Sequence, residues 1–443
     1  MISSIYKFEH GFLAVEEDGF SNTHFQLLAK YLEKQKKSYL FETSYRKGKN
    51  GIKFNSYVGV ITVKDLTIYV LPKADKDAND GDKDLWSKRL FFMLLQVRKL
   101  NVQTTSPANL QWKPNVLLNI FLKKFLDEVA VLLNRGLIKT YRKTDGNRTA
   151  LKGKLLFNKQ IAYNCVHQER FYVRYTTYDY NHILNRIIRQ ALLAICDITN
   201  SSDIKGRATS TLFNFPELDE IAVTPELFSR LIFDRKREDY RNVIKLAEMI
   251  LLNYSPDLHH GNNHVWTLMF DMNKLWEEFV FVTLRRKLIG CTVSAQKQKT
   301  LWESDNNRKT VRADIVVEKD GDVFVLDTKW KMPRYDGKIV PSDADLHQMY
   351  VYLDVYKNEG IKAKKVALLY PGKEKDVYGH FKEDNASCDM IFLPGVSGKS
   401  ESKPEESQNN DEPKMDWQKC RDWQNQIVAH IKDWIEKYNQ STL

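Results

Sequence analysis

An Asp-Gly dipeptide separates two valine-rich runs in the stretch RADIVVEKDGDVFVLDTKWK. Asp-Gly between alternating apolar runs is the strongest short-range signal for a β-hairpin with a two-residue type I′ turn. With Asp320 and Gly321 as the turn residues, Asp314 lies opposite Asp327 on the neighbouring strand. Lys329 follows Asp327 by two residues, and the alternation of side chains along a strand places it on the same face. The hairpin therefore groups two carboxylates and one ammonium on one surface.

Two opposed carboxylates need compensation for their charge. Directly opposed residues of an antiparallel pair have Cβ atoms roughly 5 Å apart, and like charges at this distance are destabilising. Val316, Val323 and Val325 share the same face, so the carboxylates stand at the edge of an apolar surface. Two carboxylates in such a place share a proton or bind a cation, and their oxygen ligands suit Mg²⁺. The alternative is an exposed hairpin face whose charges serve solubility, and spacing alone does not decide between the two.

The whole chain has the size and composition of a soluble, multidomain protein. Its 443 residues allow two or three domains, and its 42% hydrophobic and 28% charged residues are typical of globular proteins. No apolar run approaches the ~20 residues of a membrane span, and the N-terminal MISSIYKFEHGF lacks the apolar core of a signal peptide. The five cysteines include no Cys-x-x-Cys pair, so we expect no disulfide framework and a reducing cytoplasm as the compartment.

The charge balance points to an anionic partner. The net charge of +11 is that of a protein suited to nucleic acid, although many basic proteins bind nothing anionic. The sequence contains no Walker A motif: GVSGKS (395–400) lacks the first glycine at the required spacing. Any nucleotide hydrolysis linked to this chain is therefore expected in another subunit.

Composition and periodicity divide the chain into five parts. We expect a mixed α/β region over 1–84, a mainly helical middle region over 85–255 and a strand-containing region with the hairpin over 256–395. A polar linker of disordered type over 396–414 and an amphipathic helix over 415–443 follow. In the middle region, ALKGKLLFNKQIAYN is expected to be strand or loop. RFYVRYTTYDY fits a half-buried strand, with nucleic-acid stacking as the alternative.

Helical patterns flank the hairpin on both sides. MNKLWEEFVFVTLRRKL precedes it and places Glu277 on an apolar stripe, where a charge without a partner is costly. DADLHQMYVYLDVYKNE follows it, and helical spacing puts Asp345, Gln348 and Tyr352 on one face.

A basic segment joins the first of these helices to the hairpin. Its cations, which could contact DNA phosphates or simply be solvated, are Lys297, Lys299, Arg308 and Lys309.

The order of helix, strand with Asp, strand with Asp-x-Lys and helix is the core layout of PD-(D/E)xK nucleases, and Asp314, Asp327 and Lys329 fit it. The segments DMNKLWEEFV, VRADIVV, VLDTKWK and DLHQMYVYLDVY together resemble the McrC family, the nuclease subunits of the 5-methylcytosine-dependent McrBC restriction system. The resemblance extends upstream through YVGVITVKDLTIYVLPK, GLIKTYRK, LKGKLLFNKQI and NHILNRIIRQAL, and it ends near residue 395.

The resemblance implies both a fold and a chemistry. The implied fold is an α+β N-terminal region and a helical middle region, followed by an α/β PD-(D/E)xK domain with a central mixed sheet flanked by helices. The implied activity is Mg²⁺-dependent DNA cleavage. The residues it assigns are Asp314 and Asp327 as metal ligands, Lys329 and Glu277 as further catalytic residues, and Gln348 and Tyr352 in support.

The resemblance also implies partners. These are an AAA+ GTPase, a McrB-like hexamer, and DNA that carries modified cytosine, with the N-terminal half docking on the motor and stimulating it. Two other functions remain open from the residues: a non-catalytic adaptor of the motor, and a stand-alone repair or transposition nuclease of the same fold. The tail over 396–443 departs from the family pattern, and a role in assembly is one expectation for it.

Overall fold

The computed structural model describes residues 3–35, 37–46, 48–73, 83–97, 116–199, 201–235, 237–256, 264–304, 307–358, 363–372, 374–381, 387–393 and 417–439. The chain is mixed α/β and forms two compact units, each made of segments that are discontinuous in sequence. Unit 1 contains Thr62–Asp65 and Leu118–Leu268, and unit 2 contains Ser3–Ile61, Leu66–Leu117 and Met269–Leu443. Unit 2 therefore combines N-terminal residues with the hairpin region.

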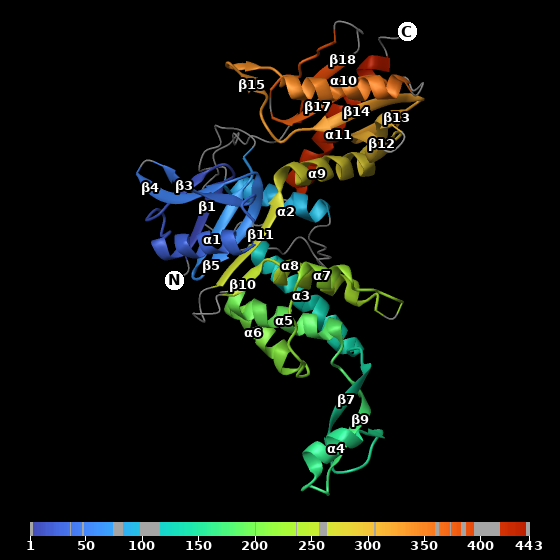
Figure 1. Ribbon diagram of the computed structural model, residues 1–443. Helices are drawn as coiled ribbons and strands as arrows, with labels where there is room; N and C mark the ends of the chain where they lie inside the picture. The colour runs from blue at the N-terminus through green and yellow to red at the C-terminus, as the bar shows by residue number, and fades with distance from the viewer. Residues whose placement is uncertain are drawn as a thin grey trace. The chain divides into compact units, whose positions relative to one another are not determined.

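The central sheet of unit 2 has five strands in the order β12-β13-β14-β17-β18 (Figure 1). Their bounds are β12 Thr292–Ser304, β13 Asn307–Lys319, β14 Asp322–Thr328, β17 Ala363–Pro371 and β18 Ser387–Leu393. The first three strands pair antiparallel, and β14, β17 and β18 run parallel. The short strands β15 (Arg334–Tyr335) and β16 (Lys338–Ile339) form a separate pair.

Helices cover both faces of this sheet because alternate residues of its inner strands are apolar on both sides. Helix α10 (Asp343–Asn358) packs on one face, where Val316, Val325 and Tyr352 join one buried cluster. The ring of Phe324, which alternation directs to the other face, lies 5.7 Å from that of Trp434 in α11 (Trp417–Asn439). Helix α9 (Met272–Lys287) packs against α11, and Gln424 donates to Thr283 Oγ1 across that contact.

The N-terminal part of unit 2 adds two small sheets and two helices. Strands β1 (Ser3–Phe8), β6 (Leu66–Leu71) and β5 (Tyr57–Val63) are neighbours in that order, and β2 (Phe12–Ala14), β4 (Lys49–Phe54) and β3 (Phe41–Arg46) form the other sheet. The helices are α1 (Asn22–Gln35) and α2 (Lys83–Gln96). Helix α2 packs on α9, with the rings of Phe92 and Phe279 6.1 Å apart.

Unit 1 is a helical body that carries a small sheet. Its helices are α3 (Val116–Arg135), α5 (Ile183–Ile198), α6 (Ser202–Phe213), α7 (Pro225–Ser229) and α8 (Tyr240–Leu251). Strands β7 (Thr140–Arg148), β9 (Phe171–Asp179) and β8 (Lys154–Leu155), with helix α4 (Phe157–Asn164), project from these helices (Figure 1). Strands β10 (Tyr254–Pro256) and β11 (His264–Asp271) pair antiparallel.

The structure corrects one expectation in this region. Residues 157–164, expected to be strand or loop, form helix α4, whose buried Asn164 donates to Asn147 Oδ1 in β7 and so ties the helix to the sheet. RFYVRYTTYDY is the half-buried strand β9, as expected. The predicted linker over 396–414 lies outside the described residues. Within the described part of the chain, no helix is both long and apolar enough to cross a bilayer.

Candidate functional site

The hairpin register is the one that the Asp-Gly dipeptide predicts. Asp320 has φ 52° and Gly321 has φ 85°, the two left-handed conformations of a type I′ turn. The ladder pairs Lys319 with Asp322 and continues to Ile315 with Leu326. Asp314 and Asp327 come one step beyond this last pair, so the two strands deliver both carboxylates to the same end of the hairpin.

Asp327 is the most unusual charged group of the site. Only 1% of its surface is exposed, and its Oδ1 has no hydrogen-bond partner among the described residues. Burial raises the pKa of Asp327 to about 7, and the negative charge of Asp314 adds to the rise, while Lys329 works against it. A buried carboxylate with a free oxygen beside a second carboxylate is a site with an unmet demand for positive charge.

The Asp314 carboxylate is hydrogen-bonded to Thr328, the residue after Asp327. Its Oδ2 accepts a hydrogen bond from the main-chain N–H of Thr328 at 2.9 Å and another from Thr328 Oγ1 at 3.0 Å. These two bonds tie the end of β14 to β13 where the ladder stops. They orient the Asp314 carboxylate and keep it close enough to Asp327 for their charges to interact.

Lys329 is ion-paired with Asp327 and interacts electrostatically with Asp314. Its Nζ lies 2.7 Å from Asp327 Oδ2, and it donates to Gln348 Oε1 at 2.8 Å. Burial opposes its charge, but the surrounding carboxylates, Asp327 foremost, outweigh burial and raise the pKa of Lys329. The ammonium is therefore charged and held in one place at neutral pH.

Helix α10 supplies the polar groups that reach Lys329. Gln348 Nε2 donates to Tyr352 Oη at 2.8 Å, and Tyr352 Oη donates to the carbonyl oxygen of Arg312 in β13 at 2.8 Å. The structure therefore joins Gln348 and Tyr352, which helical spacing places on one face, to both the catalytic lysine candidate and the strand of Asp314.

Asp345 also belongs to the site, although helical spacing predicts only its place on the same helix face as Gln348 and Tyr352. It is buried, lies 2.6 Å from Lys331 Nζ and 3.5 Å from Lys329 Nζ, and its main-chain N–H bonds to Ser342 Oγ. The signal that could have found it is Ser-x-x-Asp at the helix start, which is a capping pattern. Asp345 is therefore a second carboxylate, besides Asp327, that restrains Lys329.

Glu277 on α9 approaches the site from the other helix. Its Oε1 accepts a hydrogen bond from Gln296 Nε2 at 2.9 Å. Burial raises the pKa of Glu277, and the charge of Asp314 contributes to the rise. Glu277 is thus within electrostatic reach of Asp314. In the described chain, however, no three His, Cys, Asp or Glu side chains form a ready-made metal cluster.

The four predicted DNA-contacting cations lie on strands β12 and β13, which pair antiparallel as one long hairpin. The sequence predicts only a basic segment here, leading to the Asp-Gly hairpin of β13 and β14. Lys297 is ion-paired with Glu318 at 2.7 Å, and Lys299 Nζ lies 5.3 Å from the centre of the Tyr356 ring. Arg308 donates to Thr300 Oγ1, and Lys309 pairs with Trp302 across the strands.

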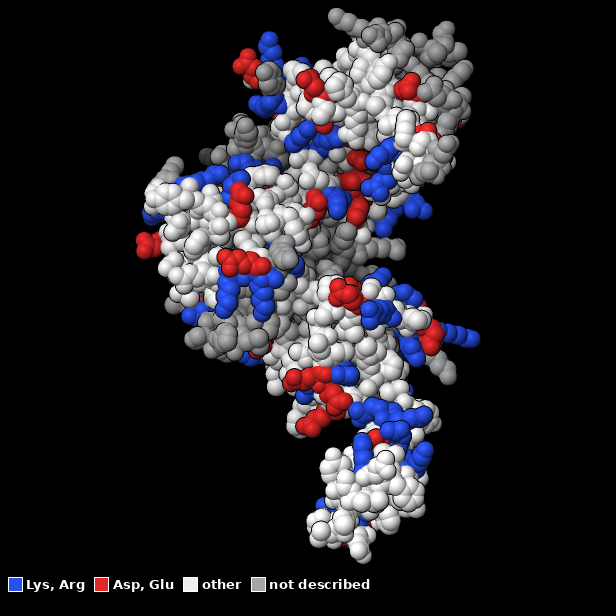
Figure 2. Space-filling model, viewed as in Figure 1, with Lys and Arg blue, Asp and Glu red and all other residues white. Residues whose placement is uncertain are grey.

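Unit 1 carries a basic cluster where β7 and β9 leave the helices (Figure 2). Arg142 in this part pairs with Asp179 and with Asp219, and Arg186 donates to the main-chain oxygen of Asp219. Arg142 and Arg186 are therefore occupied by partners of their own unit.

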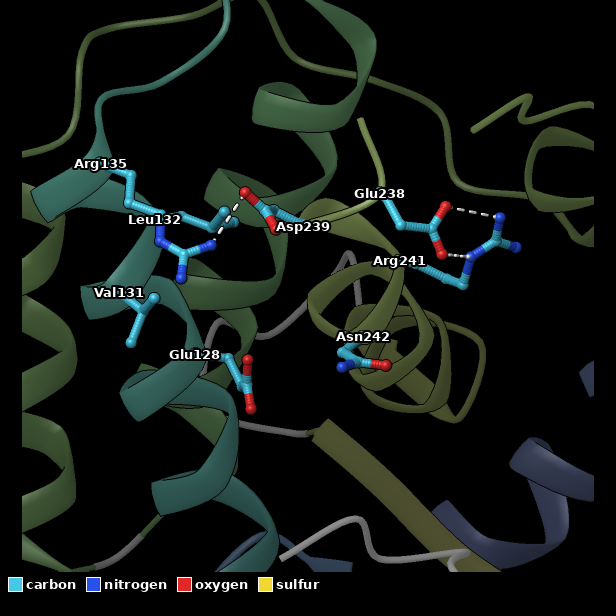
Figure 3. Close-up of a pocket in the computed structure, with 8 residues that line it drawn as sticks. All are labelled: Glu128, Val131, Leu132, Arg135, Glu238, Asp239, Arg241 and Asn242. Atoms are coloured by element: carbon cyan, nitrogen blue, oxygen red, sulfur yellow. Dashed lines mark hydrogen bonds and ion pairs between the residues drawn. The ribbon is translucent and has the colours of Figure 1, made fainter. Parts of the chain in front are cut away.

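A cavity of about 330 Å³ lies in unit 1 between α3 and α8 (Figure 3). Its charged lining residues are all ion-paired: Arg135 with Asp239 at 2.9 Å, Arg241 with Glu238 at 2.6 Å, and Glu128 with the neighbouring Lys124 at 2.5 Å. Paired charges leave little to hold a polar ligand, so the candidate site is the carboxylate pair of unit 2.

Comparison with known proteins identifies the family of this chain. The chain is 22% identical over 296 residues to the type IV methyl-directed restriction enzyme EcoKMcrBC of Escherichia coli K12. The aligned segment covers 63% of this chain and 84% of that protein. It resembles, at 20% identity and a TM-score of 0.61, a chain in the solved assembly of Thermococcus gammatolerans McrB AAA+ hexamers with bound McrC; the likeness covers 96% of this chain and 99% of that one. The sequence profile of the McrBC 5-methylcytosine restriction system component matches residues 52–371. The chain therefore belongs to the family of McrBC 5-methylcytosine restriction system components.

Proposed function

We propose that this chain is the Mg²⁺-dependent DNA endonuclease subunit of a modification-dependent restriction complex, with the McrC role in that system. The observation that carries the proposal is the buried Asp327, with its unpartnered Oδ1, next to Asp314 and Lys329. A carboxylate so placed costs folding free energy unless a cation or a proton joins it. Sites that serve only stability do not need such a group.

The surrounding elements support a PD-(D/E)xK assignment. Helix α9, strands β13 and β14, and helix α10 occur along the chain in the order expected for this nuclease core; β12 precedes β13, and the short β15 and β16 precede α10. Asp314 lies in β13, and Asp327 and Lys329 stand at the end of β14.

The donor set fits Mg²⁺, which prefers oxygen ligands and uses only one or two carboxylates. Asp327 and Asp314 are the residues that would hold it, with the unpartnered Oδ1 of Asp327 as the first ligand. When bound, Mg²⁺ acts as a Lewis acid for the scissile phosphate and lowers the pKa of a bound water. The side chains themselves provide a fixed, buried cradle of negative charge.

Lys329 supplies the fixed positive charge. During hydrolysis the water oxygen forms a bond to phosphorus, the bond from phosphorus to the leaving oxygen breaks, and negative charge grows on the phosphate. An ammonium held by Asp327 and Gln348 stabilises that charge without having to reorganise. Tyr352 keeps Gln348 in place, and Glu277 adds a further carboxylate within electrostatic reach of Asp314, which increases the demand of the site for a cation.

The proposed partners are an AAA+ GTPase ring and the DNA that the ring handles. The similarity to a chain of the McrB assembly with bound McrC supports the first, and the +11 net charge supports the second. The ring is proposed to recognise modified cytosine and translocate DNA, and this chain to stimulate its GTP hydrolysis. The expected cytoplasmic location stays a prediction.

The test is a cleavage assay of the purified chain on methylated and unmethylated DNA, with and without the McrB-like partner, GTP and Mg²⁺. We expect cleavage of methylated DNA only when all components are present. Stimulated GTP hydrolysis without any cleavage would instead identify a non-catalytic adaptor, and efficient cutting by the chain alone would identify a stand-alone nuclease.

The wild type should lose stability as pH rises and should gain stability when Mg²⁺ is added. Asp327→Asn should remove both effects. The folded pKa of Asp327, about 7, lies above the unfolded value near 3.9. The folded state therefore binds more protons between these values, and the wild type loses stability as pH rises through this window, up to about pH 7. Thermal unfolding of both proteins at pH 5 and pH 8 measures the difference.

The metal arm of this experiment uses pH 8, where Asp327 is ionised. Mg²⁺ at 100 times its Kd stabilises the wild type by about 2.7 kcal/mol. The asparagine variant should show no such shift. Equal Mg²⁺ shifts in the two proteins would exclude Asp327 as a ligand.

Replacing Lys299, Arg308 and Lys309 with glutamine should weaken DNA binding about equally on all sequences. The plot of log K against log salt has a negative slope, and each phosphate contact that is lost makes this slope less steep by about 0.9. Trp302, which is 53% exposed on the same hairpin, offers a ring for stacking and is kept in this variant. Binding titrations at several salt concentrations measure the slope.

The matched control removes the same charge elsewhere, at the exposed Lys152, Lys154 and Lys205 of unit 1. This control should leave the slope unchanged. If the variant of Lys299, Arg308 and Lys309 lost binding to methylated DNA but kept its binding to unmethylated DNA, this subunit would recognise the modified base. That result would contradict the phosphate-contact proposal.

A further inference from the structure

The residue after Lys329 is anchored by a carboxylate from the first strand region of the chain. The indole Nε1 of Trp330 donates to Glu9 Oε1 at 2.6 Å, and the two residues are separated by 321 positions in sequence. Glu9 follows strand β1 directly and belongs to the same compact unit as the site. It is as deeply buried as Asp327, at 1% exposed.

Glu9 is itself fixed from two directions. Its Oε1 also accepts a hydrogen bond from the main-chain N–H of Lys73 at 2.7 Å, just after β6, and its own N–H donates to the carbonyl oxygen of Leu71. Its Oε2 has no hydrogen-bond partner among the described residues. Burial raises the pKa of Glu9 to about 7. A carboxylate in this position is expensive, and packing alone does not require it.

Trp330 links Glu9 to the site because its ring is packed between other aromatic rings and the main chain beside it is hydrogen-bonded. Its ring lies 5.3 Å from that of Trp276 in α9 and 6.1 Å from that of Trp86 in α2. The main-chain N–H of Lys329 donates to Leu369 of β17 at 2.9 Å. The main chain at 329–330 is thus held by β17 on one side and by Glu9, through the indole, on the other.

We propose that Glu9 is a positioning residue for DNA cleavage: by orienting Trp330 it fixes the main chain at Lys329 and aims the ammonium at Asp327. The inference rests on the proposed function. Glu9 lies outside the segment that matches the family profile, residues 52–371. A small displacement of a catalytic group costs rate far more than it costs affinity, and outer partners of this kind are typically worth about 10- to 100-fold in activity.

The test is single-turnover cleavage by the assembled complex at saturating DNA, Mg²⁺ and GTP, below the unfolding temperature of each variant. Glu9→Ala should lower the cleavage rate by about 10- to 100-fold with an unchanged Kd for DNA. Glu9→Gln should restore the rate to within about threefold, because its amide oxygen accepts both hydrogen bonds. Trp330→Phe keeps a ring in the cluster but loses the donor, so it should match Glu9→Ala.

The matched control removes the same kind of bond away from the site. Trp434 Nε1 donates to the buried Asp389 Oδ2 at 2.8 Å in the same unit. Asp389→Ala should lower the unfolding temperature but leave the single-turnover rate of the folded protein unchanged.

Three outcomes would overturn the inference: Glu9→Ala or Trp330→Phe cutting at the wild-type rate, Glu9→Gln as slow as Glu9→Ala, or additive losses in the Glu9→Ala/Trp330→Phe double variant. If Glu9→Ala does not fold, Trp330→Phe and Glu9→Gln still decide. Failure of the proposed function differs from all of these, because the wild type itself would then not cut.

Discussion

A chain with Asp327→Ala should form its complex and stimulate the GTPase partner, yet show no detectable DNA cleavage. The substitution removes the buried carboxylate whose Oδ1 is the first candidate Mg²⁺ ligand and the partner that holds Lys329 at 2.7 Å. Both the cation and the aim of the ammonium are lost together. Cleavage assays on methylated DNA, with GTP turnover measured in the same tubes, separate the two activities.

Lys329→Ala should be slower than the wild type by about 100- to 1,000-fold, the usual loss when one fixed group that stabilises developing charge is removed. Mg²⁺ should still stabilise this variant against heat, because both candidate ligands remain. Matched controls are the exposed Lys338→Ala and Asp343→Ala, which change the same charges close by in sequence and should cut normally. Wild-type cutting by either site variant would refute the assignment.

The carboxylate hairpin is predictable from sequence because the rules that form it are local. An Asp-Gly turn and the alternation of side chains specify the pairing from Lys319–Asp322 to Ile315–Leu326, and the structure has that register. Helical spacing is equally local, and Gln348 and Tyr352 are hydrogen-bonded neighbours as it implies. Both patterns need only a few consecutive residues.

The rest of the site depends on contacts that no local rule encodes. The bond between Glu9 and Trp330 joins β1 to the end of β14 across most of the chain, and neither residue carries a periodic signal for the other. The long β12 strand was also missed, since its polar and charged residues read as a solvated segment; pairing with β13 makes it a strand. In both cases the deciding contact joins residues that are not neighbours in the sequence.

Deleting residues 415–443 should prevent unit 2 from folding, a larger effect than any single substitution. Helix α11 buries Trp423, Ile427, Ile431, Trp434 and Ile435. Full burial of a large apolar side chain contributes about 1.5–3 kcal/mol, so five of them approach the whole stability of a typical domain, about 5–15 kcal/mol. The truncated chain should aggregate and lose its cooperative unfolding transition in circular dichroism. This outcome would make the tail part of the nuclease core, in place of the assembly role expected from its departure from the family pattern.

A milder substitution tests the same contact in a chain that still folds. Trp434→Ala removes the ring against Phe324 and leaves Asp389 without its indole donor, so it should cost about 3–5 kcal/mol of unfolding free energy. The neighbouring Asp433 is exposed on the same helix, and Asp433→Ala should change that free energy by less than about 0.5 kcal/mol. Denaturant titrations of the two variants give the comparison. Equal stability of Trp434→Ala and the wild type would mean that α11 does not cover this face of the sheet in solution, and the tail would again be free to serve assembly.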